Sequence, residues 1–267
     1  MTKIVADAAN VALSPLQEFG RKLLVSVAEV GRFGLLMGRT FGEMGAIFRR
    51  GSTFIKECVR LGVDSLPLVL TVGTFTGAVT GWQLQYQLEG YLPYEMIGPG
   101  VFKSIVLEMG PVLTGLVIAG RVAASIAAEL GTMKVTEQID ALESMAISST
   151  RFLAVPRIAA MTLMMPVLVV QANFVGIVGA WLVCTVFLNM TSQQFFGLIP
   201  SFFYVYDIFA GLLKSLFFGL SCSMIGCYVG FNTTGGAEGV GTATIQAFVW
   251  SSLSVLILDF VLAMMLF

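Results

Sequence analysis

Five ionisable residues stand inside long apolar stretches of this sequence, where an unpaired charge is costly. Each costs about 2.5 to 3.5 kcal/mol at the centre of a membrane helix, so each should face a cavity, a partner or the interface. The five are Glu108, Arg121, Glu129, Lys214 and Asp259. We expect the last four to be structural. Arg121 needs a carboxylate or open carbonyls from another span, and a salt bridge is its expected role.

Glu108 differs from the other four because it precedes a helix-breaking pair, in the motif Glu-Met-Gly-Pro that ends at Pro111. Pro111 has no N–H to donate to the carbonyl of Leu107, and Gly110 before it is biased away from helix. We therefore predict that the backbone is interrupted beside this carboxylate. Interrupted backbone at membrane depth is tolerated where it is buried or lines a wet cavity. The pattern favours a cavity; the alternative is that Pro111 begins a helix and Glu108 lies in the outer headgroup region.

Several kinds of chemistry are excluded by the residues that the sequence lacks. It contains no histidine, which excludes imidazole metal sites and histidine acid–base catalysis. It contains no GxxxxGK[ST] motif to cradle nucleotide phosphates, so an energy source would belong to another chain. The net charge of -1 argues against a nucleic-acid surface. We expect no metal, no catalytic residue and no cofactor in this chain, and a packing role for Cys58, Cys184, Cys222 and Cys227.

The composition indicates the class of protein. The chain has 267 residues, of which 57% are hydrophobic and 12% are charged. A soluble domain of this length needs far more polar surface, so we predict an all-α integral membrane protein. Five segments can each cross a hydrocarbon core of about 30 Å at about 1.5 Å per residue. They are approximately 65–82, 105–130, 155–187 with a break near Pro166, 208–231 and 245–267.

We assign residues 1–60 to an N-terminal helical segment and residues 61–267 to a five-span domain. Ser14, a proline and Gln17 predict a helix start. Apolar residues then recur at helical spacing opposite charged ones, which predicts an amphipathic helix lying in the membrane plane. The alternative is a helix packed on a soluble partner. The apolar positions are Leu16, Phe19, Leu23, Val27 and Val30.

The basic residues predict the orientation. Nine lysines and arginines precede the first span, whereas the 188–205 loop has none. Positive charge favours the cytoplasmic side, so we expect a cytoplasmic N-terminus and, with five spans, a C-terminus on the periplasmic side. The connection between spans two and three is then cytoplasmic.

Small residues repeat at every fourth position of the spans. This spacing lets helix backbones approach closely, which drives association in lipid. We therefore predict a tightly packed bundle. The clearest stripes are Gly73, Gly77 and Gly81, then Ala172, Gly176 and Ala180, then Gly211, Ser215 and Gly219.

The connection between spans two and three contains a short polar stretch, MKVTEQIDALESMAI, over residues 133–147. We predict a helix capped by Thr136, with Glu137 and Asp140 in its first turns and Ile139, Leu142 and Ala146 on one face. An apolar face in so short a connection indicates a docking surface for a cytoplasmic partner. The alternative, a helix resting on lipid headgroups, is weakened because anionic lipid repels its carboxylates, which include Glu143.

Two stretches resemble one known family. EMGPVLTGLVIAGRVAASIAAELGTMKVTEQIDALESMAI (108–147) and GGAEGVGTATIQAFVWSSLSVLILDFVL (235–262) are similar to the MlaE-type (YrbE-like) permeases of lipid ABC transporters. The likeness covers most of the chain after about residue 50. Some members have an arginine directly before the glutamate of this motif, whereas Leu107 stands here, which puts a headgroup contact by such a cation in doubt.

The resemblance implies a homodimeric permease at the centre of a complex in the bacterial inner membrane. Its partners would be a cytoplasmic ABC ATPase that binds ATP and Mg, a periplasmic MCE-type lipid-binding protein and, in some systems, a STAS-domain protein. The lipid cavity would be lined by Leu107, Glu108, Met109 and Pro111. The coupling helix seated in the ATPase would comprise Glu137, Gln138, Ile139, Asp140, Leu142, Glu143 and Met145.

The leading hypothesis is therefore a permease subunit that moves lipid, in the first place phospholipid, between the inner membrane and the outer envelope. Such a chain performs no covalent chemistry. A secondary transporter of amphiphiles would need paired internal repeats and a coupled ion site, which five spans and one acidic motif fit poorly. A non-transporting scaffold would need neither the intramembrane carboxylate nor an interrupted second span.

Overall fold

The computed structural model describes residues 24, 27–45, 51–88 and 93–267. The chain divides into two compact units, Met1–Glu43 and Met44–Phe267, each described here by itself. In the first unit residues 27–43 are helical, with Val27 and Val30 exposed. The predicted helix start at Ser14 lies outside the described residues, as do Leu16, Phe19 and Leu23. The placement of this helix in the membrane plane stays a prediction.

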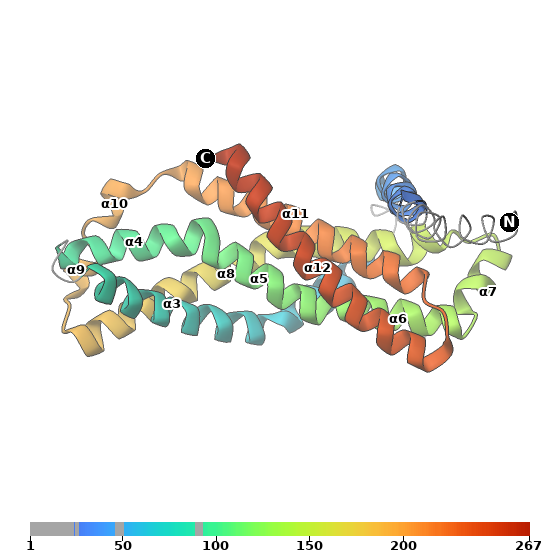
Figure 1. Ribbon diagram of the computed structural model, residues 1–267, viewed down its shortest axis with the longest axis horizontal. Helices are drawn as coiled ribbons and strands as arrows, with labels where there is room; N and C mark the ends of the chain where they lie inside the picture. The colour runs from blue at the N-terminus through green and yellow to red at the C-terminus, as the bar shows by residue number, and fades with distance from the viewer. Residues whose placement is uncertain (1–23, 25–26, 46–50, 89–92) are drawn as a thin grey trace, which may run out of the picture. The chain divides into compact units, whose positions relative to one another are not determined.

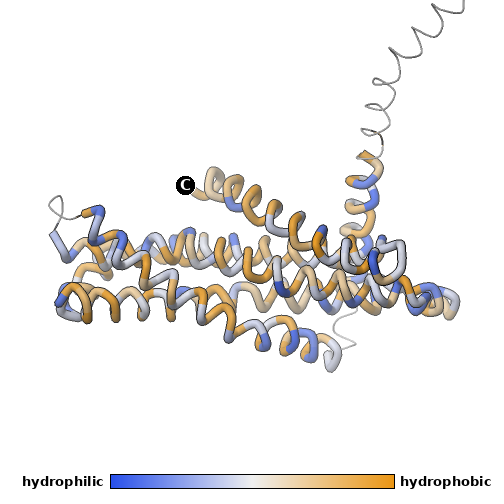
Figure 2. The backbone as a smooth tube through the Cα atoms, turned by 60° about the horizontal axis from the view of Figure 1, so that its bottom comes forward, coloured by the Kyte–Doolittle hydropathy of each residue, from blue (hydrophilic) through white to orange (hydrophobic). Residues whose placement is uncertain are grey.

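The described residues of the second unit include five helices that are long and apolar enough to cross a membrane, as predicted. Figure 2 shows that apolar residues dominate along them. Each helix is longer than its apolar stretch, because polar residues continue the helix at the ends. The five are Gly51–Leu88, Tyr94–Val135, Thr150–Leu188, Val205–Phe231 and Gly236–Leu266. The first begins before residue 60, where we placed a domain boundary, and that division stays a prediction.

The first three spans are built from several consecutive elements. The first comprises α2 (Gly51–Glu57), η2 (Cys58–Gly62), η3 (Val63–Ser65) and α3 (Leu66–Leu88). The second comprises η4 (Tyr94–Met96), α4 (Ile97–Ser104), η5 (Ile105–Met109), α5 (Gly110–Ile118), η6 (Ala119–Ala123) and α6 (Ala124–Val135). The third comprises η7 (Thr150–Ala154) and α8 (Val155–Leu188). The fourth and fifth are α11 (Val205–Phe231) and α12 (Gly236–Leu266).

Short helices lie in two of the connections between spans. α7 (Gln138–Ser144) joins the second span to the third, and α9 (Ser192–Phe196) and α10 (Ile199–Phe202) join the third to the fourth. Figure 1 places α7 at one end of the bundle, which we call the α7 end, and α9 at the opposite end, the α9 end. The two polar connections are therefore well separated.

The predicted close packing of small residues is confirmed. A Cβ added to Gly77 of α3 would lie 1.8 Å from the carbonyl oxygen of Gly176 in α8, closer than any side chain tolerates. α11 packs in the same way, since a Cβ on Gly211 would lie 2.4 Å from the carbonyl oxygen of Val106. Backbone thus lies directly on backbone, which is the main attraction between helices in lipid.

Two predicted interruptions are wrong. α8 continues as one helix through Pro166, and the backbone at Glu108 remains helical up to Pro111 and beyond. Proline is tolerated in a membrane helix where neighbouring helices and local adjustments compensate for the missing bond. The adjustment at Glu108 is a π-helical turn, η5, after which Pro111 stands in the first turn of α5.

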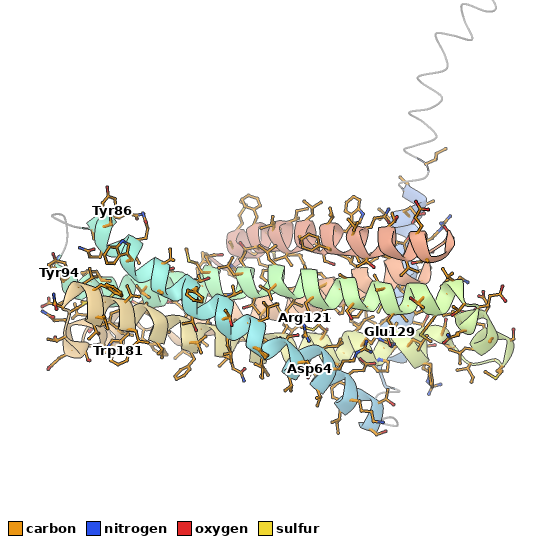
Figure 3. All side chains as sticks on the ribbon, turned by 90° about the horizontal axis from the view of Figure 1, so that it is seen from below. Asp64, Tyr86, Tyr94, Arg121, Glu129 and Trp181 are labelled. Atoms are coloured by element: carbon orange, nitrogen blue, oxygen red, sulfur yellow. The ribbon has the colours of Figure 1, made fainter. Side chains whose placement is uncertain are left out.

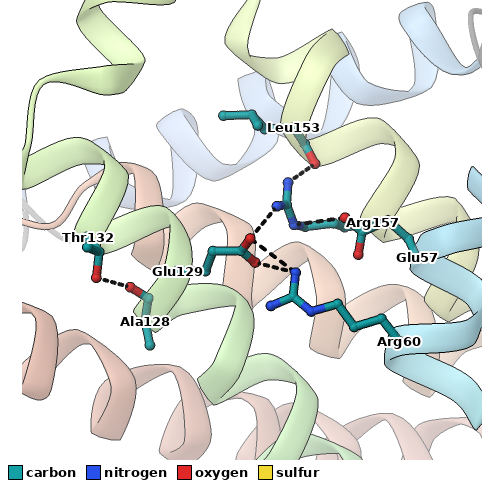
Figure 4. A network of polar contacts seen from close by, with 7 residues as sticks. All are labelled: Glu57, Arg60, Ala128, Glu129, Thr132, Leu153 and Arg157. Carbon is teal, nitrogen blue, oxygen red and sulfur yellow. Dashed lines mark hydrogen bonds and ion pairs between the residues drawn. The ribbon is translucent and has the colours of Figure 1, made fainter. Parts of the chain in front are cut away.

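A cluster of four charged side chains braces the α7 end (Figure 4). The buried Arg157 of α8 lies 3.0 Å from Glu129 of α6 and 3.7 Å from Glu57 of α2, and it donates to the carbonyl of Leu153 at 2.7 Å. Arg60 of η2 lies 2.9 Å from Glu129. The cluster joins the first three spans. It holds α6 and α8 together, and α7 lies in the connection between these two helices.

Replacing Gly77 by alanine should force α3 and α8 apart, because the new Cβ would meet backbone that cannot move aside. We expect a loss of about 1–3 kcal/mol in the free energy of unfolding, measured as thermal unfolding in detergent. The matched control is Gly241→Ala in α12, where a Cβ meets nothing within 4 Å. Equal melting temperatures for the two variants would contradict this account of the packing.

Replacing Arg157 by methionine should leave the buried Glu57 without its cation. Removal of one partner from a buried ion pair costs about 3–5 kcal/mol, so we expect this variant to unfold at a clearly lower temperature than the native protein. The control is Arg32→Gln, which breaks an exposed pair with Glu29 at 2.9 Å and should cost about 0.5 kcal/mol or less. Comparable losses in both variants would argue against a bracing role.

Candidate functional site

Three of the five intramembrane charges meet at one point. The side chain of Lys214 in α11 has no exposed surface, and its Nζ lies 2.6 Å from Glu108 Oε1 and 3.0 Å from Asp259 Oδ1. Glu108 belongs to the second span and Asp259 to α12, so three spans contribute one residue each. We call this cluster the ion triad. It gives a buried ammonium two carboxylates, which offsets much of the cost of desolvating the charge.

The local backbone of the second span supports the triad. Pro111 has no N–H, so the carbonyl of Leu107 lacks its helical donor. The Nζ of Lys214 lies 3.4 Å from this carbonyl oxygen and donates to it. The π-helical turn is closed by the N–H of Gly110, which donates to the carbonyl of Ile105. π-helical turns are frequent at functional sites, and here the turn contains the carboxylate of the triad.

The accessible part of the triad is acidic. The side chain of Glu108 is 44% exposed and that of Asp259 is 21% exposed, whereas Lys214 is covered. With all three groups ionised the net charge is -1. The exposed groups of the site are therefore carboxylate oxygens, which can accept hydrogen bonds, whereas the ammonium of Lys214 is covered. Within the described ranges, no group of His, Cys, Asp or Glu side chains is arranged to hold a metal ion.

The residues predicted to line one cavity do not share a face of the second span. Glu108 and the carbonyl of Leu107 are directed to α11, and Pro111 is buried against α11 near Gly211. Met109 is directed to α3, where its sulfur accepts a hydrogen bond from Thr80 at 3.2 Å. A narrow crevice between α3, the second span and α8 is lined by Met109 among others, and Glu108 does not line it. The role of these residues in a lipid cavity stays a prediction.

Arg121 has a partner from another span, but the partner is a hydroxyl group. Its guanidinium donates to Ser65 Oγ in η3, and within the described part of the chain no carboxylate lies within ion-pair distance of it. The expected salt bridge is therefore not observed. Arg121 stands in the π-helical turn η6, which sets the direction of its side chain differently from a regular helix. Figure 3 shows Arg121 and Glu129 at different positions along the second span.

The predicted helix in the connection exists as α7, but its start differs from the prediction. Glu137 occupies the N-cap position in the left-handed conformation, with φ of 59°, and makes no side-chain cap. Thr136 does not cap the helix, because its hydroxyl donates back to the carbonyl of Thr132. Ala146 lies beyond the helix end with φ of 58°, so it does not extend the predicted face.

α7 is fastened to the chain on both sides. Asp140 lies 2.6 Å from Lys134 at the end of α6, and Glu143 accepts a hydrogen bond from Ser149 Oγ at 2.8 Å. Ile139 is buried within the chain and Leu142 is half-buried, which leaves Met145, next to the end of α7, as a large exposed apolar side chain. The outer surface of α7 thus combines carboxylates with one flexible apolar side chain. Docking of a partner there stays a prediction.

Sequence reasoning missed a second pair between the second span and α11. Lys103 lies 3.7 Å from Asp207. Lys103 precedes Glu108 by five residues and Asp207 precedes Lys214 by seven. The sequence signal for this pair is a lysine in one span and an aspartate at the corresponding depth of another. Lys103 and Asp207 stand just outside the predicted spans 105–130 and 208–231, so a search for charges within the apolar stretches does not include them.

Comparison with known proteins now identifies the family. The model of the family described as Permease MlaE matches residues 54–265. The chain is 34% identical over 254 residues to the intermembrane phospholipid transport system permease protein MlaE of Haemophilus influenzae, covering 94% of this chain and 97% of that protein. It is 38% identical over 234 residues to a probable ABC transporter permease protein of Synechocystis sp., covering 87% and 88%.

A plant protein is also related. The chain is 32% identical over 213 residues to the protein TRIGALACTOSYLDIACYLGLYCEROL 1, chloroplastic, of Arabidopsis thaliana, covering 80% of this chain and 61% of that protein. The family match includes all the residues of the ion triad and of α7. The chain, a multi-pass membrane protein with five candidate spans, belongs to the MlaE permease family.

Proposed function

We propose that this chain is the permease subunit of an ATP-driven transporter that moves phospholipid between the inner membrane and the outer envelope. The observation that carries the proposal is the ion triad, which places two partly exposed carboxylates from two spans, paired with a buried lysine from a third, at membrane depth. Such groups are expensive in lipid and mark substrate pathways. The name of the Haemophilus influenzae relative, an intermembrane phospholipid transport permease, supports the same function.

ATP hydrolysis would occur in a separate cytoplasmic ATPase that holds ATP and Mg, and α7 would be the point of contact. The geometry supports this role. α7 is tied to α6 by the Lys134–Asp140 pair, and α6 is tied to α8 by Arg157 and Glu129. A displacement of α7 would therefore move the second and third spans together, and the second span contains Glu108.

The transporter would be a homodimer in the bacterial inner membrane, with the N-terminus cytoplasmic and the C-terminus periplasmic. Support for a second copy comes from α12, which exposes a row of large apolar side chains that fit lipid or another helix. They include Phe248, Trp250, Leu253, Ile257 and Phe260. The further partners would be a periplasmic MCE-type lipid-binding protein and, in some complexes, a STAS-domain protein.

Replacing Glu108 by alanine should impair lipid transfer by about tenfold or more, equivalent to 1.4 kcal/mol, because the most exposed acceptor of the triad is lost. The measurement is transfer of a labelled phospholipid by the purified complex in proteoliposomes with ATP, normalised to the amount of variant recovered from the membrane, because the buried Lys214 also loses one of its partners. The control is Glu95→Ala, which removes an exposed carboxylate at the start of the same span. Full activity of the Glu108 variant would remove this residue from the mechanism.

The same assay separates the function classes. A secondary transporter would move lipid with an ion gradient and without nucleotide. A scaffold would move no lipid under either condition. Either result in the native complex would overturn the proposed function.

Reversing the charge of both Glu137 and Asp140 to lysine should release the ATPase from the purified complex and leave the permease dimer intact. The reason is that these carboxylates lie on the outer surface of α7, where a partner would contact them. Recovery of the ATPase with the tagged permease is measured. Lys134→Gln is the control, since it breaks the internal pair with Asp140 and leaves the outer carboxylates in place. Undiminished ATPase recovery from the double variant would count against docking at α7.

A further inference from the structure

The pair formed by Lys103 and Asp207 lacks the close contact of the ion triad. The Nζ of Lys103 lies 3.7 Å from Asp207 Oδ2, which is longer than a hydrogen bond. The side chain of Asp207 is 9% exposed, and its Oδ2 is buried with no hydrogen-bond partner. Buried polar atoms are nearly always satisfied, so an orphaned carboxylate oxygen calls for a donor. Lys103 is 38% exposed and remains open to a ligand.

This pair lies on the same seam between the second span and α11 as the ion triad. Lys103 is five residues from Glu108 along the second span and Asp207 is seven residues from Lys214 along α11. At 1.5 Å per residue, the pair is about 7–10 Å nearer to the α9 end. The polarity is reversed, since the cation here belongs to the second span and the anion to α11.

Aromatic side chains surround this end of the bundle. The Nζ of Lys103 lies 4.9 Å from the ring centroid of Tyr204. Figure 3 shows Tyr86, Tyr94 and Trp181 at the same end. Tyrosine and tryptophan are enriched at the level of the lipid headgroups. The aromatic residues therefore place the pair near the expected level of the lipid headgroups.

The two groups require different properties of one ligand. An accessible ammonium such as Lys103 attracts an anionic phosphate. The orphaned oxygen of Asp207 requires an N–H or O–H donor within hydrogen-bond reach. A free phosphate satisfies the lysine alone, and a quaternary ammonium headgroup has no N–H to donate. A phosphate ester with a primary amine satisfies both groups.

We propose that Lys103 and Asp207 form a second headgroup subsite, selective for phospholipids that combine a phosphate with a primary ammonium. This inference rests on the proposed function as a lipid permease. It adds a second binding site for the headgroup, nearer the α9 end than the ion triad. Lys103 contacts the phosphate, and Asp207 accepts a hydrogen bond from the ammonium. The headgroup of phosphatidylethanolamine has this chemistry.

The test uses the complete complex in proteoliposomes with ATP and compares three labelled lipids: phosphatidylethanolamine, phosphatidylcholine and phosphatidic acid. The native complex should transfer phosphatidylethanolamine in preference to phosphatidylcholine by about tenfold, since one charge-assisted hydrogen bond is at stake. Asp207→Asn should abolish that preference and leave phosphatidic acid transfer unchanged. Lys103→Gln should slow all three lipids, and Lys103→Arg, which keeps the charge, should restore them.

The outcomes separate this inference from the proposed function. A native complex that moves none of the three lipids contradicts the function itself. Active transfer with no preference for the primary amine, or with the same preference in Asp207→Asn, overturns the subsite and leaves the function standing. If Asp207→Asn does not reach the membrane, Asp207→Ser removes the carboxylate with a smaller side chain and is judged by the same ratio of the two lipids.

Discussion

The structure of the five-span unit depends on one buried cation. Lys214 has no exposed surface and stands in the middle of a helix that is long enough to cross a membrane. A bare ammonium in that position is too costly to retain, so the fold must bring anions to it. Glu108 and Asp259 do this from two other spans. The depth at which the second, fourth and fifth spans are in register is therefore fixed by electrostatics as well as by glycine packing.

The sequence predicted features that depend on residues close together in the chain. The five spans follow from local hydropathy, and close packing of helix backbones follows from small residues at every fourth position, although the pairing of α3 with α8 comes from the structure. It did not predict which charges pair, because the partners of Lys214 are 106 and 45 residues away and depend on how each helix is rotated. Pro111 and Pro166 look alike as helix breakers. The structure continues the helix through both, and a lysine takes up the carbonyl beside Pro111.

The rotation of a helix about its own axis changes at a π-helical turn, and a pattern read at a regular period of 3.6 residues does not predict such turns. In the described part of the chain these turns are η2, η5, η6 and η7, and each includes one acidic or basic residue: Arg60, Glu108, Arg121 and Arg151. An extra residue per turn changes the face on which later side chains lie. Arg121 stands in one of these turns and donates to the hydroxyl of Ser65, where a carboxylate or open carbonyls, and a salt bridge above all, were expected.

The charged side chains at the two ends of the bundle are arranged differently, and this difference is compatible with a transporter. At the α7 end two arginines and two glutamates neutralise one another across three spans, with Arg157 within 3.0 Å of Glu129. Near the α9 end Lys103 and Asp207 stand 3.7 Å apart, and one carboxylate oxygen has no donor. Both ends contain a buried carboxylate oxygen without a donor, Glu57 Oε2 at the α7 end and Asp207 Oδ2 near the α9 end. They differ in connectivity, since the first belongs to a network of four charges and the second to a single pair whose lysine is 38% exposed. Under the proposed function, the ATPase would act at the α7 end and a headgroup would be accommodated near the α9 end.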